Sequence, residues 1–174
     1  MRQSQKKVVI LVEKDFEDIE LLYPYYRLIE EGYKVDLAGP SADVFQGKHG
    51  YPVRANVTFD DLKPENYEAV IIPGGKAPEY IRMRKEAVEF VKKMNNAGKL
   101  VATICHGPQV LISAGVLNGR KITCVPSIRD DVVNAGATYV DEPVVADGNL
   151  VSSRYPPDLP YFAREVVKRL KEKS

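Results

Sequence analysis

The stretch Lys7-Val8-Val9-Ile10-Leu11-Val12 is a continuous apolar run bounded by charged residues. Such a run predicts a strand buried on both faces. A second strand is predicted at Tyr33–Ala38, after Gly32 ends a helix. Because strand, helix and strand fit within about 35 residues, they predict a βαβ unit with parallel strands and a right-handed crossover. The helix reaches Glu30, and its apolar residues at helical spacing are Phe16, Ile19, Leu22, Tyr23 and Tyr26.

The same alternation continues outward along the chain. Residues 40–66 are the most irregular stretch, and the chain shows no repeat or linker. We therefore predict an α/β protein, a three-layer sandwich with a mostly parallel sheet, as a single domain over residues 1–174. The further predicted strands are Ala69–Ile72, Leu100–Ile104, Ile122–Val125 and a hairpin over Val144–Ser152, and the further predicted helices are Glu86–Asn96, Pro108–Ala114, Ile128–Ala135 and Leu159–Lys171.

Composition narrows the classes of function. Hydrophobic residues make up 44% and charged residues 28%, as in a globular protein. The net charge of +1, from 25 basic and 24 acidic residues, favours neither nucleic acid nor an anionic membrane as a partner. The N-terminus M-R-Q-S-Q-K-K predicts no signal peptide, and no apolar run approaches the length of about 20 residues that spans a bilayer. We expect a cytoplasmic location, where the two cysteines are free thiols.

Ligands of open parallel sheets bind beyond the carboxyl ends of the strands. Three segments are predicted at that edge, namely Glu13–Asp18, Pro73–Tyr80 and Cys105–Pro108. They contain the candidate functional residues.

Cys105 directly follows a predicted strand and precedes His106, Gly107 and a helix that opens at Pro108. Strand, sharp turn and helix are the layout of a nucleophile elbow, in which Gly107 allows close approach. The helix N-terminus is expected to lower the pKa of the thiol by about one and a half units. The alternative is a small buried residue at a strand end.

His106 is the candidate base, although adjacent residues on a sharp turn point in different directions, and a surface imidazole is the alternative. Glu17 is either an ordinary first-turn acid or a protonated acid beside the thiol. Glu79 is predicted to open a helix after Pro73-Gly74-Gly75, whose glycines allow N–H groups to point at an oxyanion. Because no set of ligands surrounds His49 or His106, neither a metal site nor a cofactor is expected.

Several segments in the same order resemble the PfpI family of intracellular cysteine peptidases, within the ThiJ/PfpI superfamily. The resemblance covers nearly the whole chain. The matching segments are D-F-E-D-I-E-L-L-Y-P at Asp15–Pro24, G-K-H-G-Y at Gly47–Tyr51, P-G-G-K-A-P-E at Pro73–Glu79, I-C-H-G-P-Q-V-L-I-S-A at Ile104–Ala114, G-R-K-I-T at Gly119–Thr123 and D-G-N-L-V-S-S-R at Asp147–Arg154.

The resemblance implies a flavodoxin-like fold related to class I glutamine amidotransferases. It implies Cys105 as nucleophile, His106 as its partner and Glu17 as a protonated acid on the sulfur. It further implies that Glu79 of a neighbouring subunit completes a Cys-His-Glu triad, in a dimer or in a hexamer built as a trimer of dimers. The oxyanion donors would be the N–H groups of Gly75 and His106. Val125 departs from the tyrosine that close relatives often carry, which puts any role of that hydroxyl in doubt.

Two functions of different class follow. In the first, Cys105 attacks a carbonyl, either in peptides or in methylglyoxal and its adducts, as a peptidase, deglycase or glyoxalase. In the second, the protein is a redox or stress sensor with a chaperone-like role, in which Cys105 is oxidised. Glutamine amidotransferase chemistry is disfavoured because no histidine follows His106.

Overall fold

The computed structural model describes residues 6–173. The prediction that the chain has no signal peptide rests partly on residues 1–5, which lie outside the described range. Within residues 6–173, seven strands form the central sheet in the order β10-β11-β7-β6-β1-β2-β5. All neighbours pair in parallel except β10 and β11, which form the predicted hairpin. The strands are β1 Lys7–Leu11, β2 Lys34–Gly39, β5 Val57–Thr58, β6 Ala69–Ile72, β7 Leu100–Ile104, β10 Val145–Asp147 and β11 Leu150–Ser153.

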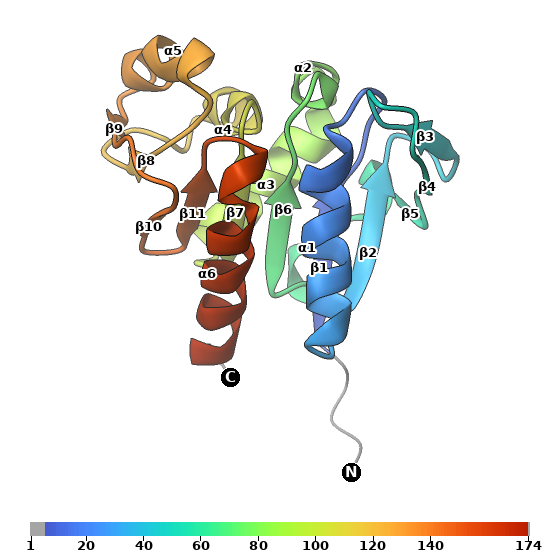
Figure 1. Ribbon diagram of the computed structural model, residues 1–174. Helices are drawn as coiled ribbons and strands as arrows, with labels where there is room; N and C mark the ends of the chain where they lie inside the picture. Colours follow the sequence, from blue (N-terminus) through green and yellow to red (C-terminus); the bar gives the residue numbers. More distant parts are fainter. Residues whose placement is uncertain (1–5, 174) are drawn as a thin grey trace.

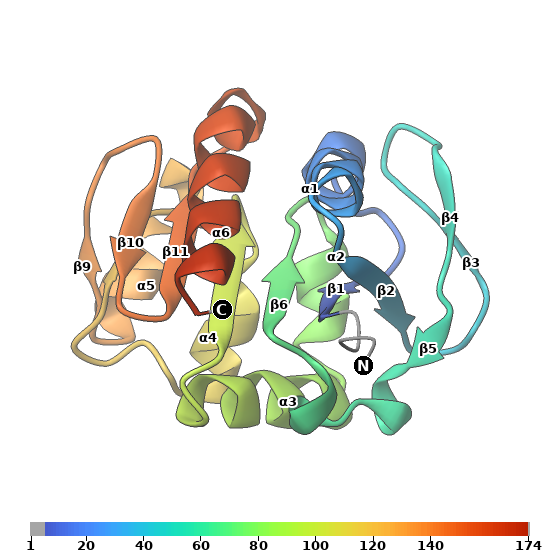
Figure 2. The same ribbon diagram turned by 90° about the horizontal axis from the view of Figure 1, so that it is seen from below.

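Helices cover both faces of this sheet. Helices α1 (Asp18–Glu30) and α6 (Leu159–Glu172) lie side by side on one face, and α3 (Lys85–Asn96) and α4 (Pro108–Ala114) cover the other (Figures 1 and 2). The predicted three-layer α/β sandwich is confirmed. Within residues 6–173, no helix combines the length and apolarity needed to cross a membrane.

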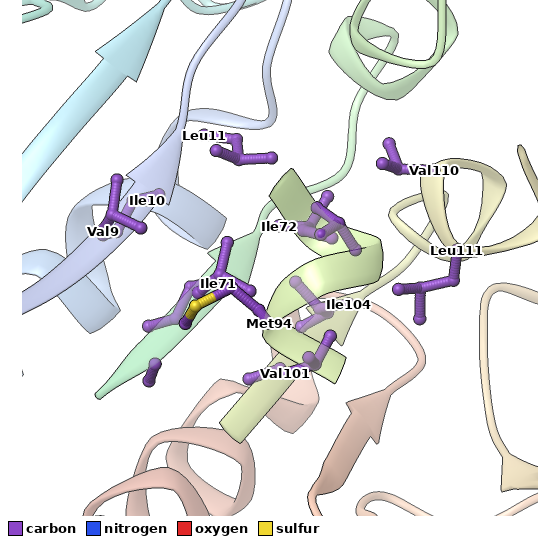
Figure 3. Packing of buried hydrophobic residues seen from close by; sticks show 14 of the residues in the cluster. Val9, Ile10, Leu11, Ile71, Ile72, Met94, Val101, Ile104, Val110 and Leu111 are labelled. Atoms are coloured by element: carbon purple, nitrogen blue, oxygen red, sulfur yellow. The ribbon is translucent and has the colours of Figure 1, made fainter. Parts of the chain in front are cut away.

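The core explains why the strands could be predicted. The three central strands β1, β6 and β7 are fully buried over nearly their whole length, since helices cover them on both sides. Their side chains pack with those of α3 and α4, including Met94, Val110 and Leu111 (Figure 3).

The apolar residues whose spacing predicted helix α1 do not all lie on the face of the helix that packs against the core. Ile19, Tyr23 and Tyr26 are 49%, 41% and 57% exposed, whereas Leu21 and Leu28 pack into the core. An acid, Glu20, is fully buried on the inner face of the helix. The helix therefore places apolar side chains in solvent and a carboxyl inside the protein.

The predicted strand over Ile122–Val125 is wrong beyond its first residue. The structure forms only β8 (Lys121–Ile122), which pairs in parallel with β9 (Thr138–Tyr139). The following backbone leaves the ladder because Thr123 donates its N–H to the hydroxyl of Ser152, and Val125 donates its N–H to the carbonyl of Cys105. This segment therefore supports the turn that carries the cysteine.

Two smaller regions complete the fold. The stretch 40–66, interpreted as irregular, contains a short antiparallel pair, β3 (Val44–Gln46) and β4 (Pro52–Arg54). Helix α5 (Arg129–Asn134) lies where a short helix was predicted. The short helix α2 (Ala77–Ile81) follows the glycine pair after β6. The α2 end of the sheet, at the top of Figure 1, is the edge at which the parallel strands end.

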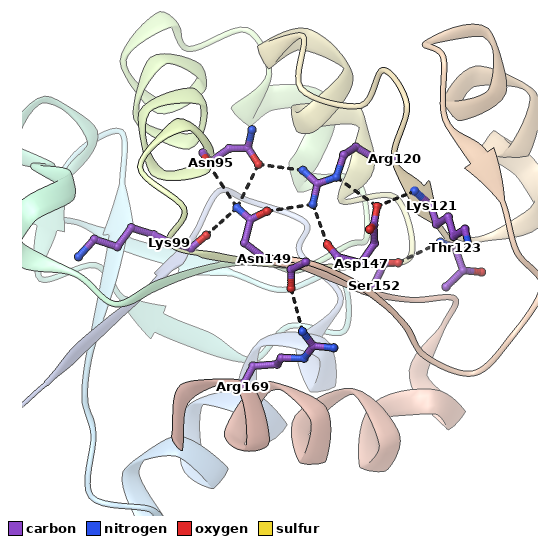
Figure 4. Close-up of polar contacts among 10 residues, drawn as sticks. Asn95, Lys99, Arg120, Lys121, Thr123, Asp147, Asn149, Ser152 and Arg169 are labelled. Carbon is purple, nitrogen blue, oxygen red and sulfur yellow. Dashed lines mark hydrogen bonds and ion pairs between the residues drawn. The ribbon is translucent and has the colours of Figure 1, made fainter. Parts of the chain in front are cut away.

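A polar network centred on Arg120 fixes the hairpin to the end of α3 (Figure 4). Its guanidinium donates to the carboxylate and carbonyl of Asp147 and to the side-chain oxygens of Asn149 and Asn95. Asn149 in turn donates to the carbonyl of Lys99, directly before β7. These bonds hold β11 beside β7, whose last residue precedes the candidate nucleophile.

Candidate active site around Cys105

Cys105 lies on a strained turn between β7 and α4. Its φ of 64° is in the left-handed region, which is unusual for a residue other than glycine. Gly107 follows it in a space with no room for a side chain, because an added Cβ would clash with the hydroxyl of Thr103 and lie 2.6 Å from the carbonyl oxygen of Ile72. The predicted sharp turn is confirmed, and it projects the thiol at the carboxyl edge of the sheet.

Backbone donors surround the sulfur. The N–H groups of Gly75 and His106, the predicted oxyanion donors, donate toward the thiol and oppose the rise of its pKa. Gly75 has a φ of 79° and pairs with Phe16 in an isolated bridge that joins the loop after β6 to the segment before α1. Gly75 thus lets the backbone turn its own N–H toward Cys105, while the N–H of Gly74 donates to Glu20.

The acid that interacts with the sulfur is Glu20, not Glu17, and this corrects the prediction. A Cβ built on Gly74 would lie 2.5 Å from Glu20 Oε1 and 2.6 Å from Cys105 Cβ, so both side chains flank that glycine. Glu20 Oε1 accepts the Gly74 N–H at 2.8 Å, and the carboxyl interacts with the thiol of Cys105.

Glu17 has other partners. It lies directly before the first residue of α1, outside the helix that carries Glu20. From this position its carboxylate pairs with Lys48 at 2.6 Å and with His49 at 3.3 Å. Glu20 lies one turn further along the same helix and points inward. The signal that could have identified it is an acid directly beside Leu21, an apolar residue of the buried face.

Burial sets the protonation of the acid and the thiol. It raises the pKa of Glu20 to about 8, against the opposing hydrogen bond from Gly74. Burial, and after it the negative charge of Glu20, raise the pKa of Cys105 to about 12, so the net shift is opposite in direction to the lowering expected from the helix N-terminus. Since Glu20 still holds its proton at pH 7, its charge is then largely absent and the acid can donate a hydrogen bond to the sulfur.

His106 is placed to exchange a proton with Cys105. Its Nδ1 lies 3.4 Å from the sulfur, and its Nε2 lies 3.3 Å from the hydroxyl of Ser127. Burial lowers the pKa of the imidazole, an effect that the charge of Glu79 opposes and that of Lys48 reinforces. No sequence pattern marks Ser127 as a partner of His106, because it lies in a 3-10 turn after the segment predicted as a strand.

Glu79 lies in the first turn of α2 at the same edge of the sheet. Among the described residues, the hydrogen-bonding partners of the imidazole are Cys105 and Ser127, so Glu79 acts on His106 within this chain only through its charge. Its predicted place in the site of a neighbouring subunit stays a prediction.

The remaining candidates lie around this centre. Cys124 is a buried free thiol, and Val125 packs against the core while its N–H supports the elbow. Within residues 6–173, no group of three or more His, Cys, Asp or Glu side chains is arranged to hold a metal ion.

Comparison with known proteins places the chain in a family. Residues 6–169 match the DJ-1/PfpI family. The sequence is 54% identical over 165 residues to "Deglycase PfpI" of Pyrococcus furiosus, covering 95% of this chain and 99% of that protein, and equally similar to "Deglycase PH1704" of Pyrococcus horikoshii, with the same coverage.

Solved structures agree with this similarity. A two-domain protein from Anabaena variabilis with DJ-1/ThiJ/PfpI-like and ferritin-like domains superposes with a TM-score of 0.95 at 41% identity, over 96% of this chain and 48% of that one. This chain therefore spans about half of that protein. Drosophila melanogaster DJ-1beta superposes with a TM-score of 0.90 at 26% identity, over 96% of this chain and 91% of that one. The chain belongs to the DJ-1/PfpI family.

Proposed function

We propose that this protein is a cysteine-dependent hydrolase of the PfpI type, in which the Cys105 thiolate attacks a carbonyl carbon. The observation that carries the proposal is the set of groups around one strained thiol. The Gly75 and His106 N–H groups, the Glu20 carboxyl and the His106 imidazole all act on the same sulfur. Perturbed titratable groups gathered at a sheet edge are typical of a catalytic site.

The geometry supports a definite division of roles. His106 Nδ1 takes the thiol proton, the sulfur–carbon bond forms, and the electron pair of the carbonyl moves to its oxygen. The N–H groups of Gly75 and His106 stabilise that oxyanion, and Glu20 keeps its proton and donates to the sulfur or to the oxygen. With a peptide, His106 then protonates the leaving amine, and water releases the acyl group from the sulfur. With methylglyoxal, the oxyanion is protonated to a thiohemiacetal, a proton moves from its C1 to its C2 to give a lactoyl thioester, and water hydrolyses that thioester to lactate and the free thiol.

We propose deglycase or glyoxalase activity on methylglyoxal-type carbonyls as the leading substrate assignment, with peptide hydrolysis as the competing one. The deglycase names of the Pyrococcus relatives support this order.

The test compares turnover of methylglyoxal, a methylglyoxal-treated amino acid and a small fluorogenic peptide by the wild type and Cys105→Ser. Wild-type turnover is expected to fall by at least about a thousandfold in the variant. Equal rates in both proteins would refute the nucleophile.

Oxidation of Cys105 is the second candidate function, in which the protein is a redox or stress sensor. It is favoured by a partly exposed free thiol next to a protonated acid. In the reducing cytoplasm that we propose as its location, both cysteines would start as thiols. Mass spectrometry after mild peroxide treatment is expected to find oxidation at Cys105 before the buried Cys124, and the reverse order would exclude this role.

We also propose a homo-oligomer, dimer or hexamer, in which Glu79 completes the site of a neighbouring subunit. Two features support it: the carboxylate has no direct contact with His106 within the chain, and an apolar groove of about 910 Å³ opens at the surface. The exposed residues Ile19, Tyr23 and Tyr26 line this groove together with Pro156 and Pro157. Large exposed apolar patches are typical of protein interfaces.

A further inference from the structure

The Gly47–Tyr51 loop is fixed onto the start of α1 by a buried carboxylate. Asp18 accepts the N–H groups of His49 and Tyr51, each at 3.0 Å. Gly47 lies so close to this carboxylate that an added Cβ would clash with it. Lys48 donates its own N–H to the carbonyl of Phe16 at 2.9 Å. The loop therefore has a defined position beside the segment that bridges to Gly75.

This anchoring places the ammonium group of Lys48 at the mouth of the site. Its Nζ lies 2.6 Å from Glu17 Oε2, and Glu17 is held in turn by its N–H bond to the carbonyl of Gly74. The Lys48 side chain is 46% exposed. Since an ammonium group has three donors and the described contact uses one, the others are open to a ligand on the solvent side.

The charge of Lys48 acts on all the reacting groups. It opposes the rise of the pKa of Cys105 and of Glu20, and it lowers the pKa of His106. The ionisable groups that act on Lys48 in return are Glu17, Cys105 and Glu20. The contacts agree with these charge effects, because Glu17, which holds the ammonium, donates its N–H to the carbonyl of Gly74, and a Cβ built on Gly74 would lie 2.6 Å from Cys105 Cβ. A group bound to this ammonium therefore lies on the same side of the site as the thiol.

We propose that Lys48 forms an anion subsite, which selects substrates that carry a carboxylate next to the carbonyl attacked by Cys105. The geometry favours this role over that of a cation dedicated to the thiolate, because the close contact of Lys48 is with Glu17 and nearly half of its side chain is exposed to solvent. An entering carboxylate can share the ammonium with Glu17 through a charge-assisted hydrogen bond. The inference rests on the proposed function only in taking Cys105 as the reacting thiol.

The test uses two alkylating probes of nearly equal size, iodoacetate, which is anionic, and iodoacetamide, which is neutral. With either probe the sulfur–carbon bond of Cys105 forms while the carbon–iodine bond breaks and iodide leaves with the electron pair. Because both probes react with the same thiolate, a change in thiol pKa cancels in the ratio of the two rates. The ratio compared is the rate with iodoacetate divided by the rate with iodoacetamide. In the wild type this ratio is expected to exceed that of N-acetylcysteine. In Lys48→Met it is expected to fall about tenfold, as for the loss of one charge-assisted hydrogen bond.

Matched variants separate the subsite from general charge effects. Lys48→Arg is expected to keep most of the ratio, and Glu17→Gln to raise it, because the competing carboxylate is removed. Lys92→Met, which removes the same charge from an exposed position on α3, is expected to leave the ratio unchanged. An unchanged ratio in Lys48→Met, or an equal fall in Lys92→Met, would overturn the subsite. Failure of the proposed function would instead appear as full hydrolytic turnover by Cys105→Ser, a result independent of this ratio.

Discussion

At the scale of single residues, Glu20 makes the stability of the protein depend on pH. Its pKa is about 8 in the folded chain, against an ordinary value of 4.5. The folded state therefore binds a proton that the unfolded state has released, and the free energy of unfolding falls as pH rises from about 4.5 to 8, by up to about 1.4 kcal/mol per pH unit.

In Glu20→Gln this contribution is expected to vanish. The measurement is urea denaturation at a series of pH values between 5 and 8, with Glu89→Gln as control, because Glu89 is exposed on α3. The control is expected to keep the wild-type slope of unfolding free energy against pH. A wild-type slope in Glu20→Gln would show that the buried carboxyl is already ionised at pH 5.

Ser127 is expected to act as a positioning residue for His106. The contact of its hydroxyl with Nε2 leaves Nδ1 directed at the sulfur. Loss of one such hydrogen bond is worth about 0.5–1.5 kcal/mol, so Ser127→Ala is expected to lower kcat/KM roughly threefold to tenfold. Ser127→Thr, which keeps the hydroxyl, is expected to restore it. The pH profile of kcat/KM is the decisive readout, and an unshifted imidazole limb in Ser127→Ala would contradict the assignment.

The sequence marks the candidate pair Cys105 and His106 but not the residues that surround it. Cys105 and His106 could be predicted because the strand, the turn and the helix around them follow one another directly in the sequence. Both Glu17 and Glu20 are buried, and the sequence does not separate them, because the residue at which α1 begins and the side on which it packs decide which carboxyl reaches the thiol. The raised pKa of the thiol depends on burial in three dimensions, which spacing does not give.

At the scale of elements, the accuracy of prediction followed the depth of burial. Strands β6 and β7 were predicted with their observed bounds and β1 to within one residue, because strands covered on both faces have continuous apolar sequences. The strands β3, β4, β5 and β9 have two or three residues each and exist through pairing with distant segments, so no local pattern marks them.

The elbow itself gives a stability prediction at this scale. Gly107 has ordinary helical dihedrals, so Gly107→Ala adds steric conflict without backbone strain. Because the conflict is with the buried Thr103 side chain and the Ile72 carbonyl, we expect a loss of about 2 kcal/mol or more in the free energy of unfolding. Gly115→Ala, at the other end of α4, meets no atom within 4 Å and has a φ of 70°, so it is expected to cost about 1 kcal/mol. Urea denaturation of both variants checks the order, and a smaller loss in Gly107→Ala would contradict the close packing of the elbow.

At the scale of the whole molecule, the proposed sharing of Glu79 between subunits can be tested by complementation. Cys105→Ala and Glu79→Gln are each expected to be nearly inactive while keeping the wild-type oligomeric state. If a site combines Cys105 of one subunit with Glu79 of another, a mixed dimer contains one site in which both residues are wild type. Random mixing of equal amounts is therefore expected to recover about a quarter of the wild-type activity, since half of the dimers are mixed and each has one intact site of two. The two variants are unfolded together, refolded and assayed, with separately refolded samples as controls. The contrary outcome is a refolded mixture whose activity equals the sum of the activities of the separate samples, while native mass spectrometry shows that mixed oligomers have formed. That result would place Glu79 in the site of its own subunit.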